Sequence, residues 1–218
     1  MKMKLSRYID HTLLAPQATA AQIVQLCHEA RVHDFFSVCV NPARVKQAKS
    51  ALADSTVKVC TVIGFPLGAD SSTTKAFAAV DAIASGADEL DMVMNIGLAK
   101  DGNWAVVQAD IAAVVQAVAG RALVKVILET CLLTEDEIRH ACTAVVQAGA
   151  DFVKTSTGFS GSGATVGAVR LMRACVGPNF GVKASGGIRT PADFQAMLAA
   201  GANRIGASAG IKLLSDSV

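Results

Sequence analysis

Three stretches of the sequence repeat one another, and this repetition is what most constrains the fold. They read SGADELDMV (85–93), AGADFVKTS (148–156) and AGANRIGAS (200–208). In each, a glycine suited to a helix C-terminus is followed by a tight turn through Asp or Asn and then by a strand. Each copy therefore predicts a helix that delivers the chain into a parallel strand.

The rest of the chain continues this alternation of strands and helices. Strands are expected to begin near Ile9, Phe36, Val57, Glu89, Ala122, Phe152, Gly181 and Arg204. Helices are expected over residues 20–33, 42–53, 71–86, 102–120, 134–149, 165–176, 190–200 and 211–215. Their predicted first residues and caps are Thr19, Asn41 with Pro42, Thr134 with Glu137, and Thr190 with Pro191 and Asp193.

A unit of about 27 residues repeated eight times is the size of a lean (β/α)8 barrel. The chain of 218 residues, 52% hydrophobic and 17% charged, can bury one large core. We therefore predict the α/β class and a single-domain (β/α)8 TIM barrel over residues 1–218. The alternative is a doubly wound open sheet, which usually carries a nucleotide-binding loop. Neither GxGxxG nor GxxxxGK[ST] follows any predicted strand.

The charge and hydropathy patterns exclude several classes of partner. The formal net charge is +2 and no run of Lys or Arg stands out, so neither a nucleic acid nor an acidic membrane is expected as a partner. The longest apolar stretch, 111–128, is broken by polar residues, and the first residues lack the apolar core of a signal peptide. Six cysteines without a CxxC pair predict reduced core residues in a cytoplasmic protein.

Two lysines interrupt stretches that otherwise have the pattern of buried strands. Lys154 follows Val153 in DFVKTSTGFSGSG, and Lys183 follows Val182 in GVKASGGIR. An ammonium group on an inward strand position costs several kcal/mol to desolvate unless it is paired, neutralised or used. The plain alternative is that both lysines lie at strand ends and reach out to solvent.

If the two lysines lie on consecutive parallel strands, the strands are roughly 4.8 Å apart. Ammonium nitrogens about 6 Å apart, in an effective dielectric of about 20, repel by roughly 2.8 kcal/mol, or about two pKa units. One of the two should then be partly neutral near pH 7. A neutral amine is a nucleophile, so the pair predicts covalent chemistry.

Other polar residues share the strand patterns and would gather at the carboxyl ends of the barrel strands. Asp91 stands in an apolar strand, where a carboxylate needs a partner such as a lysine of a neighbouring strand. The residues of this group are Asp10, Cys39, Asp91, Lys125, Lys154 and Lys183. A buried ion-pair network without chemistry is the alternative, with Lys125 only an extra charge and with Asp10 and Thr12 capping the barrel floor.

Two glycine-rich loops predict a phosphate site. Ser185 to Arg189 (SGGIR) follows the seventh strand, and residues 206–210 (GASAG) follow the eighth, ahead of a short helix. Barrels bind phosphate at these two places, through backbone N–H groups and a helix N-terminus. Two ordinary turns are the alternative. The four histidines are scattered without ligand spacing, which disfavours a metal-dependent mechanism, and we expect no cofactor.

With these residues placed, the sequence closely resembles the deoxyribose-phosphate aldolase family over nearly its whole length. The resembling segments are IDHTLL (9–14), VCVNP (38–42), VIGFPLG (62–68), TKAFAAVDAIASGADELDMVMNIG (74–97), VKVILET (124–130), DFVKTSTGF (151–159), VKASGGIRT (182–190) and RIGAS (204–208). KTSTGF and KASGGIRT together are the most specific of them.

The resemblance implies a lyase that catalyses a reversible, metal-free class I aldol reaction. Its substrate would be 2-deoxy-D-ribose 5-phosphate, and its products D-glyceraldehyde 3-phosphate and acetaldehyde. By the resemblance Lys154 is the Schiff-base lysine, Lys183 the auxiliary lysine and Asp91 the proton-handling carboxylate. The implied phosphate contacts are Gly158, Gly186, Gly187, Arg189 and Ser208.

The chain departs from the pattern of some family members at two places. They have a lysine after KTSTG and a C-terminal tyrosine that assists proton transfer, whereas this chain has Phe159 and ends in SDSV. Two other functions stay open at this point. One is a phosphosugar isomerase or synthase in which Lys183 is a general base, and the other is a barrel that only binds a phosphorylated metabolite. Whether the chain forms a homo-oligomer is left open as well.

Overall fold

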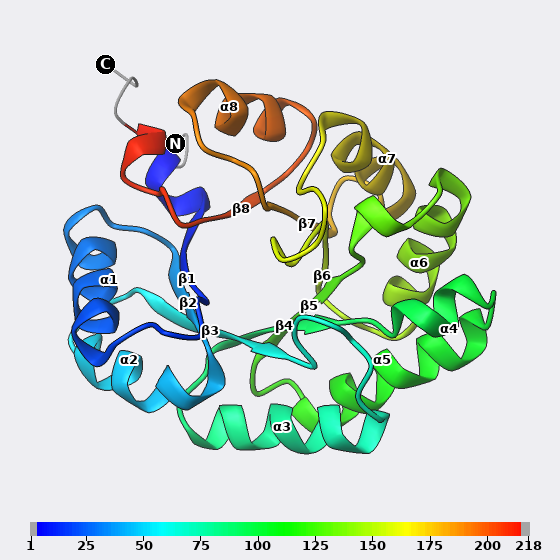
Figure 1. Ribbon diagram of the computed structural model, residues 1–218, viewed down its shortest axis with the longest axis horizontal. Helices are drawn as coiled ribbons and strands as arrows, with labels where there is room; N and C mark the ends of the chain where they lie inside the picture. Colours follow the sequence, from blue (N-terminus) through cyan, green and yellow to red (C-terminus); the bar gives the residue numbers. More distant parts are fainter. Residues whose placement is uncertain (1–3, 215–218) are drawn as a thin grey trace.

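Eight parallel strands close into a barrel in the order β1 to β8, and helices form a ring outside it (Figure 1). The computed structural model describes residues 4–214. The strands are β1 Ile9–Leu13, β2 Ser37–Val40, β3 Lys58–Ile63, β4 Glu89–Val93, β5 Leu123–Ile127, β6 Phe152–Lys154, β7 Gly181–Ser185 and β8 Arg204–Ala207. The pairing of β1 with β8 closes the barrel.

The helices cover the strands in sequence order, as the short βα units require. They are α1 Ala20–Val32, α2 Val45–Ala51, α3 Ser72–Ala84, α4 Ile96–Lys100, α5 Trp104–Val118, α6 Glu135–Gln147, α7 Val166–Val176 and α8 Pro191–Ala199. Short 3-10 turns occur at η1 Leu5–Tyr8, η2 Pro42–Arg44, η3 Thr130–Leu132 and η4 Lys212–Leu214. The predicted (β/α)8 barrel is confirmed, and each strand begins at the expected residue or the one after it.

The fold differs from the prediction at two helices. The connection after β4 holds an additional helix, α4, ahead of α5, and Asn95 caps it by accepting a hydrogen bond from the Leu98 N–H at 3.1 Å. Five residues are too few for a periodic pattern to reveal a helix. The expected terminal helix at 211–215 is the 3-10 turn η4, and Ser215 lies outside the described residues.

The three repeated stretches have a common structural role. Each glycine has a positive φ at the end of a helix, +106° at Gly86, +78° at Gly149 and +110° at Gly201. The Asp or Asn two residues later accepts a hydrogen bond from a backbone N–H of the preceding strand. These pairs are Asp88 with Val59 at 2.9 Å, Asp151 with Val124 at 2.8 Å and Asn203 with Val182 at 2.8 Å. The repeat therefore fixes the register of β4, β6 and β8 on their neighbours.

Most of the predicted helix starts are capped by the expected side chains. Complete capping boxes occur at Thr19, at Thr134 with Glu137, and at Thr190 with Asp193. Asn41 is the N-cap of η2 and is followed by Pro42 in its first turn, as predicted, but its side chain makes no cap hydrogen bond. Its amide donates instead to the Leu14 carbonyl at 3.0 Å and ties the loop after β1 to the end of β2.

The cysteines are less uniformly buried than the sequence suggests. All six are free thiols, and four of them are buried, but Cys131 and Cys175 are exposed, so these two do not belong to the core. Within residues 4–214, no helix combines the length and apolar character that crossing a membrane requires.

A buried ion pair joins α3 to α5 beneath the end of β4. The Lys75 ammonium lies 2.7 Å from an Asp110 carboxylate oxygen and donates to the Val93 carbonyl at 3.0 Å, while Ser72 donates to the other Asp110 oxygen. Both charged side chains are buried. Removing one partner would leave the other charge buried and uncompensated.

Lys75→Met is therefore expected to lower the free energy of unfolding by about 3–5 kcal/mol, measured by urea denaturation. The control is Lys75→Met combined with Asp110→Leu, which removes both charges and should recover most of the loss. Equal destabilisation of the single and the double variant would show that lost packing, rather than the unpaired carboxylate, causes the effect.

Candidate active site

Strand register places the predicted lysines side by side. Lys154 of β6 pairs directly with Lys183 of β7, and Asp91 of β4 pairs with Lys125 of β5. All four side chains are buried. Alternate residues of a barrel strand face the interior, so these side chains meet there. The prediction that the two lysines occupy neighbouring strands is confirmed, and neither lysine reaches out to solvent.

Asp91 lies at the centre of this group. Its Oδ2 accepts hydrogen bonds from Lys154 Nζ at 2.6 Å and from Lys183 Nζ at 2.8 Å, and its Oδ1 accepts from Lys125 Nζ at 2.8 Å. The Cys60 thiol donates to Oδ1 at 3.2 Å. One carboxylate thus binds three lysines, and the nitrogens of Lys154 and Lys183 share its Oδ2 atom.

A second layer of charges lies deeper in the barrel. Lys183 contacts Asp10 at 2.5 Å, and Lys125 contacts Glu89 at 2.7 Å. Arg204 binds both of these carboxylates, at 2.9 Å for Asp10 and 3.0 Å for Glu89. These contacts form one continuous charge network, whose members are Asp10, Glu89, Asp91, Lys125, Lys154, Lys183 and Arg204.

Two members of this network, Glu89 and Arg204, were not predicted. Glu89 stands two residues before Asp91, so strand alternation puts both carboxylates on the inner face of β4. That signal was available in the sequence. Arg204 stacks on the Phe36 ring, with its guanidinium carbon 3.4 Å from the ring centroid, and this contact depends on the closure of the barrel.

Burial and mutual attraction oppose each other in the pKa values of the network. Burial alone would raise the pKa of Asp91, but Lys125, Lys154 and Lys183 hold it well below its usual range. Burial alone would lower the pKa of Lys183, but Asp10 and Asp91 raise it well above its ordinary value. Near neutral pH, Asp91 is thus ionised and Lys183 is protonated.

The same balance applies to the other charges. The pKa of Asp10 is lowered by Arg204 and Lys183 although burial opposes this, and the pKa of Lys125 is raised by Asp91 although burial opposes that. Asp10 thus belongs to the charge network. Thr12, two residues further along β1, donates to the Asp10 carbonyl at 2.8 Å and faces the cavity described next.

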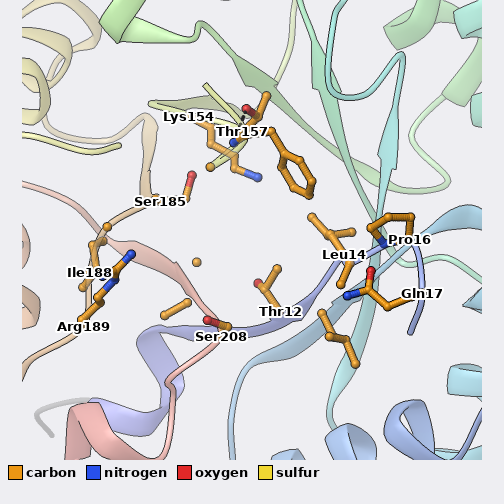
Figure 2. Close-up of a pocket in the computed structure, with 18 residues that line it drawn as sticks. Thr12, Leu14, Pro16, Gln17, Lys154, Thr157, Ser185, Ile188, Arg189 and Ser208 are labelled. Atoms are coloured by element: carbon orange, nitrogen blue, oxygen red, sulfur yellow. Dashed lines mark hydrogen bonds between the residues drawn. The ribbon is translucent and has the colours of Figure 1, made fainter. Parts of the chain in front are cut away.

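A cavity of about 470 Å³ opens above Lys154 at the carboxyl ends of the strands (Figure 2). All five of the predicted phosphate contacts line it: Gly158, Gly186, Gly187, Arg189 and Ser208. Figure 2 shows Arg189 and Ser208 on one side of the cavity and Leu14 and Pro16 on the other. Arg189 makes the first side cationic, whereas the opposite side holds the apolar Leu14 and Pro16 together with Gln17. The side formed by Leu14, Pro16 and Gln17 was not predicted.

The loop after β7 depends on glycine. Gly186 has φ +84° and Gly187 has φ +77°, in the region that residues with a side chain rarely adopt. A Cβ atom on Gly186 would lie 2.9 Å from Gly163 Cα, in the loop after β6. The two loops thus approach each other closely at the rim, and their backbones face the cavity.

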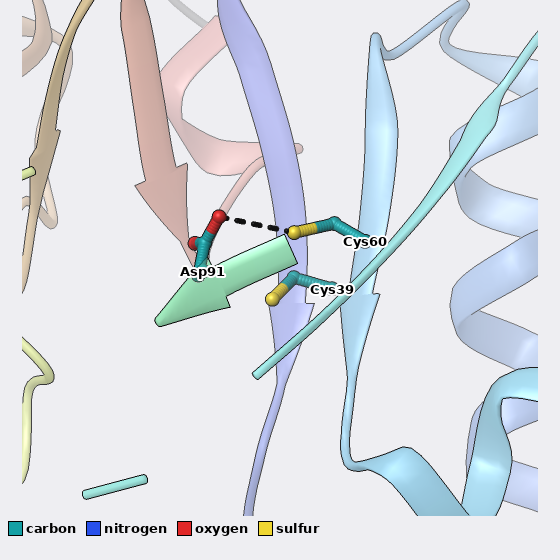
Figure 3. A group of neighbouring side chains, drawn as sticks. All are labelled: Cys39, Cys60 and Asp91. Atoms are coloured by element: carbon teal, nitrogen blue, oxygen red, sulfur yellow. Dashed lines mark hydrogen bonds between the residues drawn. The ribbon is translucent and has the colours of Figure 1, made fainter. Parts of the chain in front are cut away.

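Cys39, Cys60 and Asp91 bring three potential metal-ligating atoms within 4.8 Å of one another (Figure 3). The charges around them do not suit a cation, because Asp91 already binds three lysines. Burial also raises the pKa of the Cys60 thiol well above its usual value, so that it stays neutral. The predicted residue Cys39 lies in the barrel interior beside Asp91, and the group is better described as part of the lysine network.

Comparisons with known proteins agree on one family. The family described as DeoC/LacD family aldolase matches residues 5–216. The deoxyribose-phosphate aldolase of Lysinibacillus sphaericus (strain C3-41) is 58% identical over 218 residues, covering 100% of this chain and 98% of the relative. That of Brevibacillus brevis (strain 47) is 60% identical over 215 residues, covering 99% and 97%.

Solved structures give the same result. The deoxyribose phosphate aldolase from Aeropyrum pernix, which is described as having a unique tetrameric structure, matches with a TM-score of 0.91 and 35% identity, covering 98% of this chain and 90% of that one. An aldolase designated QR15 matches with a TM-score of 0.93 and 39% identity, covering 99% and 96%.

Proposed function

The chain belongs to the DeoC/LacD family of aldolases, and from this premise we propose that it is a deoxyribose-phosphate aldolase. It cleaves 2-deoxy-D-ribose 5-phosphate reversibly into D-glyceraldehyde 3-phosphate and acetaldehyde, through a Schiff base on Lys154. Full-length relatives at 58–60% identity support the activity. The charge balance inside the barrel supports the choice of lysine.

That balance is the observation that carries the mechanism. The network contains three carboxylates, of Asp10, Glu89 and Asp91, and four basic side chains, of Lys125, Lys154, Lys183 and Arg204. Three of the basic groups each contact two carboxylates. Lys154 contacts only one, and shares that oxygen with Lys183. An unbalanced charge in a dry interior is costly, so the network is most stable when one base is neutral.

Lys154 has the fewest carboxylate contacts of the four basic side chains, and in our proposal it is the one that reacts as a neutral amine. It also lies at the base of the cavity, where a substrate can reach it. The neutral amine attacks the C1 aldehyde of the open-chain sugar, and loss of water gives a protonated Schiff base. This cation is an electron sink for the next step.

Cleavage breaks the C2–C3 bond of the sugar. The C3 hydroxyl loses its proton as glyceraldehyde 3-phosphate leaves, and the C2 electron pair moves into the iminium to give an enamine. The enamine takes up a proton at C2, and water then hydrolyses the iminium to acetaldehyde and free Lys154. In our proposal Asp91 and an ordered water carry these protons.

Asp91 and Lys183 have electrostatic roles in this scheme. Between proton transfers Asp91 is ionised and is the counter-ion of the iminium, while the fixed charge of Lys183 favours the neutral form of its neighbour Lys154. The two carboxylates that keep Lys183 protonated also make it a poor general base. This argues against an isomerase or synthase in which Lys183 abstracts a proton.

We propose that the sugar phosphate binds at the cationic side of the cavity, against the glycine loops and Arg189. Arg189→Ala should therefore raise KM for 2-deoxyribose 5-phosphate by about tenfold to a hundredfold, because a charge-assisted contact is lost. KM for unphosphorylated 2-deoxyribose should change little. Steady-state kinetics with both sugars measure the difference.

The control is Arg170→Ala, which removes an exposed arginine of α7 that does not line the cavity. It should affect neither sugar. Equal losses on both sugars in Arg189→Ala would show that the loop after β7 is not the phosphate site.

The function itself is tested by release of aldehyde from 2-deoxyribose 5-phosphate in the presence of EDTA. Turnover under these conditions excludes a barrel that only binds a metabolite. Borohydride reduction during turnover should add a stable mass to Lys154. Turnover without any trapped adduct would instead support a reaction without an imine.

We also propose that copies of this chain associate in solution and that the enzyme acts in the cytoplasm. The association is supported by the A. pernix relative, which is described as tetrameric. Sedimentation velocity at micromolar concentration tests it, and a single monomeric species would contradict it.

The cytoplasmic location rests on the free thiols, and fractionation of the source cells tests it.

A further inference from the structure

Glu129, just after β5, is a buried carboxylate that the mechanism above does not use. It is fully buried, and no ion pair among the described residues includes it. A buried carboxyl group without a cation beside it needs hydrogen-bond partners within the protein. The donors around Glu129 therefore indicate what it holds.

Apart from a long contact from the Cys131 thiol at 3.9 Å, these donors come from the loop after β6, starting at Thr157. Both the hydroxyl and the backbone N–H of Thr157 donate to the Glu129 carboxylate, the latter at 3.3 Å. The Ser160 hydroxyl donates at 3.0 Å. The Thr157 hydroxyl in turn accepts from the Phe159 N–H at 3.0 Å. Glu129 thus fixes both ends of the segment 157–160.

The backbone of Glu129 is unusual as well. It has φ 56° and ψ 61°, in the left-handed region that a residue with a side chain seldom adopts. Glycine suits such a position better, so a glutamate there needs support from its surroundings. Hydrogen bonds to its side chain from Thr157, Ser160 and Cys131 supply that support, and the turn aims the carboxylate toward the loop after β6.

The segment held by Glu129 forms part of the substrate cavity. Thr157, Gly158 and Phe159 all line it together with Lys154, and Gly158 faces the glycine loop that follows β7. We propose that Glu129 is a positioning residue, which fixes segment 157–160 in the conformation that receives the phosphorylated end of the substrate. This inference rests on the proposed function and extends it to a residue outside the cavity lining.

The first test is Glu129→Gln, which keeps the size of the side chain and replaces one acceptor oxygen by a donor. Donors would then face donors at Thr157 or Ser160, and segment 157–160 would lose its fixed position. KM for 2-deoxyribose 5-phosphate should rise by about tenfold or more, while kcat for unphosphorylated 2-deoxyribose stays within about threefold. Glu135→Gln, at an exposed glutamate, is the matched control.

The second test separates the side chain from the backbone. Glu129→Gly suits the left-handed φ but removes the carboxylate, so it should raise KM for the phosphorylated sugar as Glu129→Gln does. Thr157→Val removes the hydroxyl partner. Because Glu129 acts through Thr157, the two changes should not add. KM for the phosphorylated sugar in the double variant Glu129→Gln/Thr157→Val should be about that of the more impaired single variant.

Three results would overturn the proposal. The first is an unchanged KM in Glu129→Gln, and the second is an equal loss of kcat on both sugars. The third is full additivity of the Glu129 and Thr157 changes. Borohydride trapping of acetaldehyde on Lys154 is measured in every variant. Trapping that persists while KM rises supports a positioning role, whereas wild-type protein that traps nothing would count against the proposed function and not against this inference.

Discussion

Lys154→Met is expected to abolish aldol cleavage, lowering kcat on the order of 10⁴-fold or more, because no other amine can form the imine. Methionine has nearly the length of the lysine side chain. The substitution removes one basic group, so three cations and three carboxylates remain in the network. The fold should therefore persist, as judged by circular dichroism and thermal unfolding. Aldehyde release and borohydride trapping followed by mass spectrometry measure the loss.

The control for this variant is Lys46→Met, at an exposed lysine of α2, which should keep full activity and full trapping. An adduct that is still trapped in Lys154→Met, on Lys183 or Lys125, would contradict the choice of nucleophile. The lysine that carries the adduct would then have to be the neutral base of the network.

Lys183→Leu is expected to have the second largest effect, and its effect should depend on pH. Without Lys183 the network holds three carboxylates and three basic groups, so Lys154 is stabilised as an ammonium and loses its nucleophilic form near pH 7. Removal of roughly 2.8 kcal/mol of repulsion should move the pH midpoint of activity upward by about one to two units. Activity at pH 7 should fall by about tenfold to a hundredfold and recover in part as pH rises.

The pH profile of kcat/KM between about pH 6 and pH 10 measures this effect. If folded Lys183→Leu is equally inactive across the whole range, Lys183 must transfer a proton itself, and the electrostatic account is wrong. Lys125→Met is a useful comparison. It also removes a cation that contacts Asp91, but its second partner is Glu89 rather than Asp10.

Much of the fold was predictable because its signals are local. The repeated glycine and Asp or Asn residues mark each arrival at a strand, and the structure shows why: Asp88, Asp151 and Asn203 each bind a backbone N–H of the preceding strand. The lysines were detectable because a charge in an apolar strand is costly. Helix α4 was missed because it is too short to show a period.

The missing parts of the site depend on contacts that no local pattern contains. Arg204 reaches Glu89 from a strand 115 residues away, and only the closure and stagger of the barrel bring them together. Glu129 binds Thr157 across two loops, 28 residues apart. The side of the cavity with Leu14, Pro16 and Gln17 also forms only when the loop after β1 folds over the strand ends. The sequence thus predicted the lysines and their aspartate partners, but not Glu89, Arg204 or Glu129.

The central claim is that an excess of one basic group over the carboxylates makes Lys154 the neutral amine. Trapping acetaldehyde on Lys154 with cyanoborohydride as a function of pH tests it most directly, in wild type, Lys183→Leu and Lys183→Leu/Asp10→Asn. The double variant leaves three basic groups and two carboxylates and so restores the excess of one. The account predicts that the pH midpoint of trapping rises by about one to two units in the single variant and returns toward the wild-type value in the double variant. The same midpoint in all three folded proteins would contradict it.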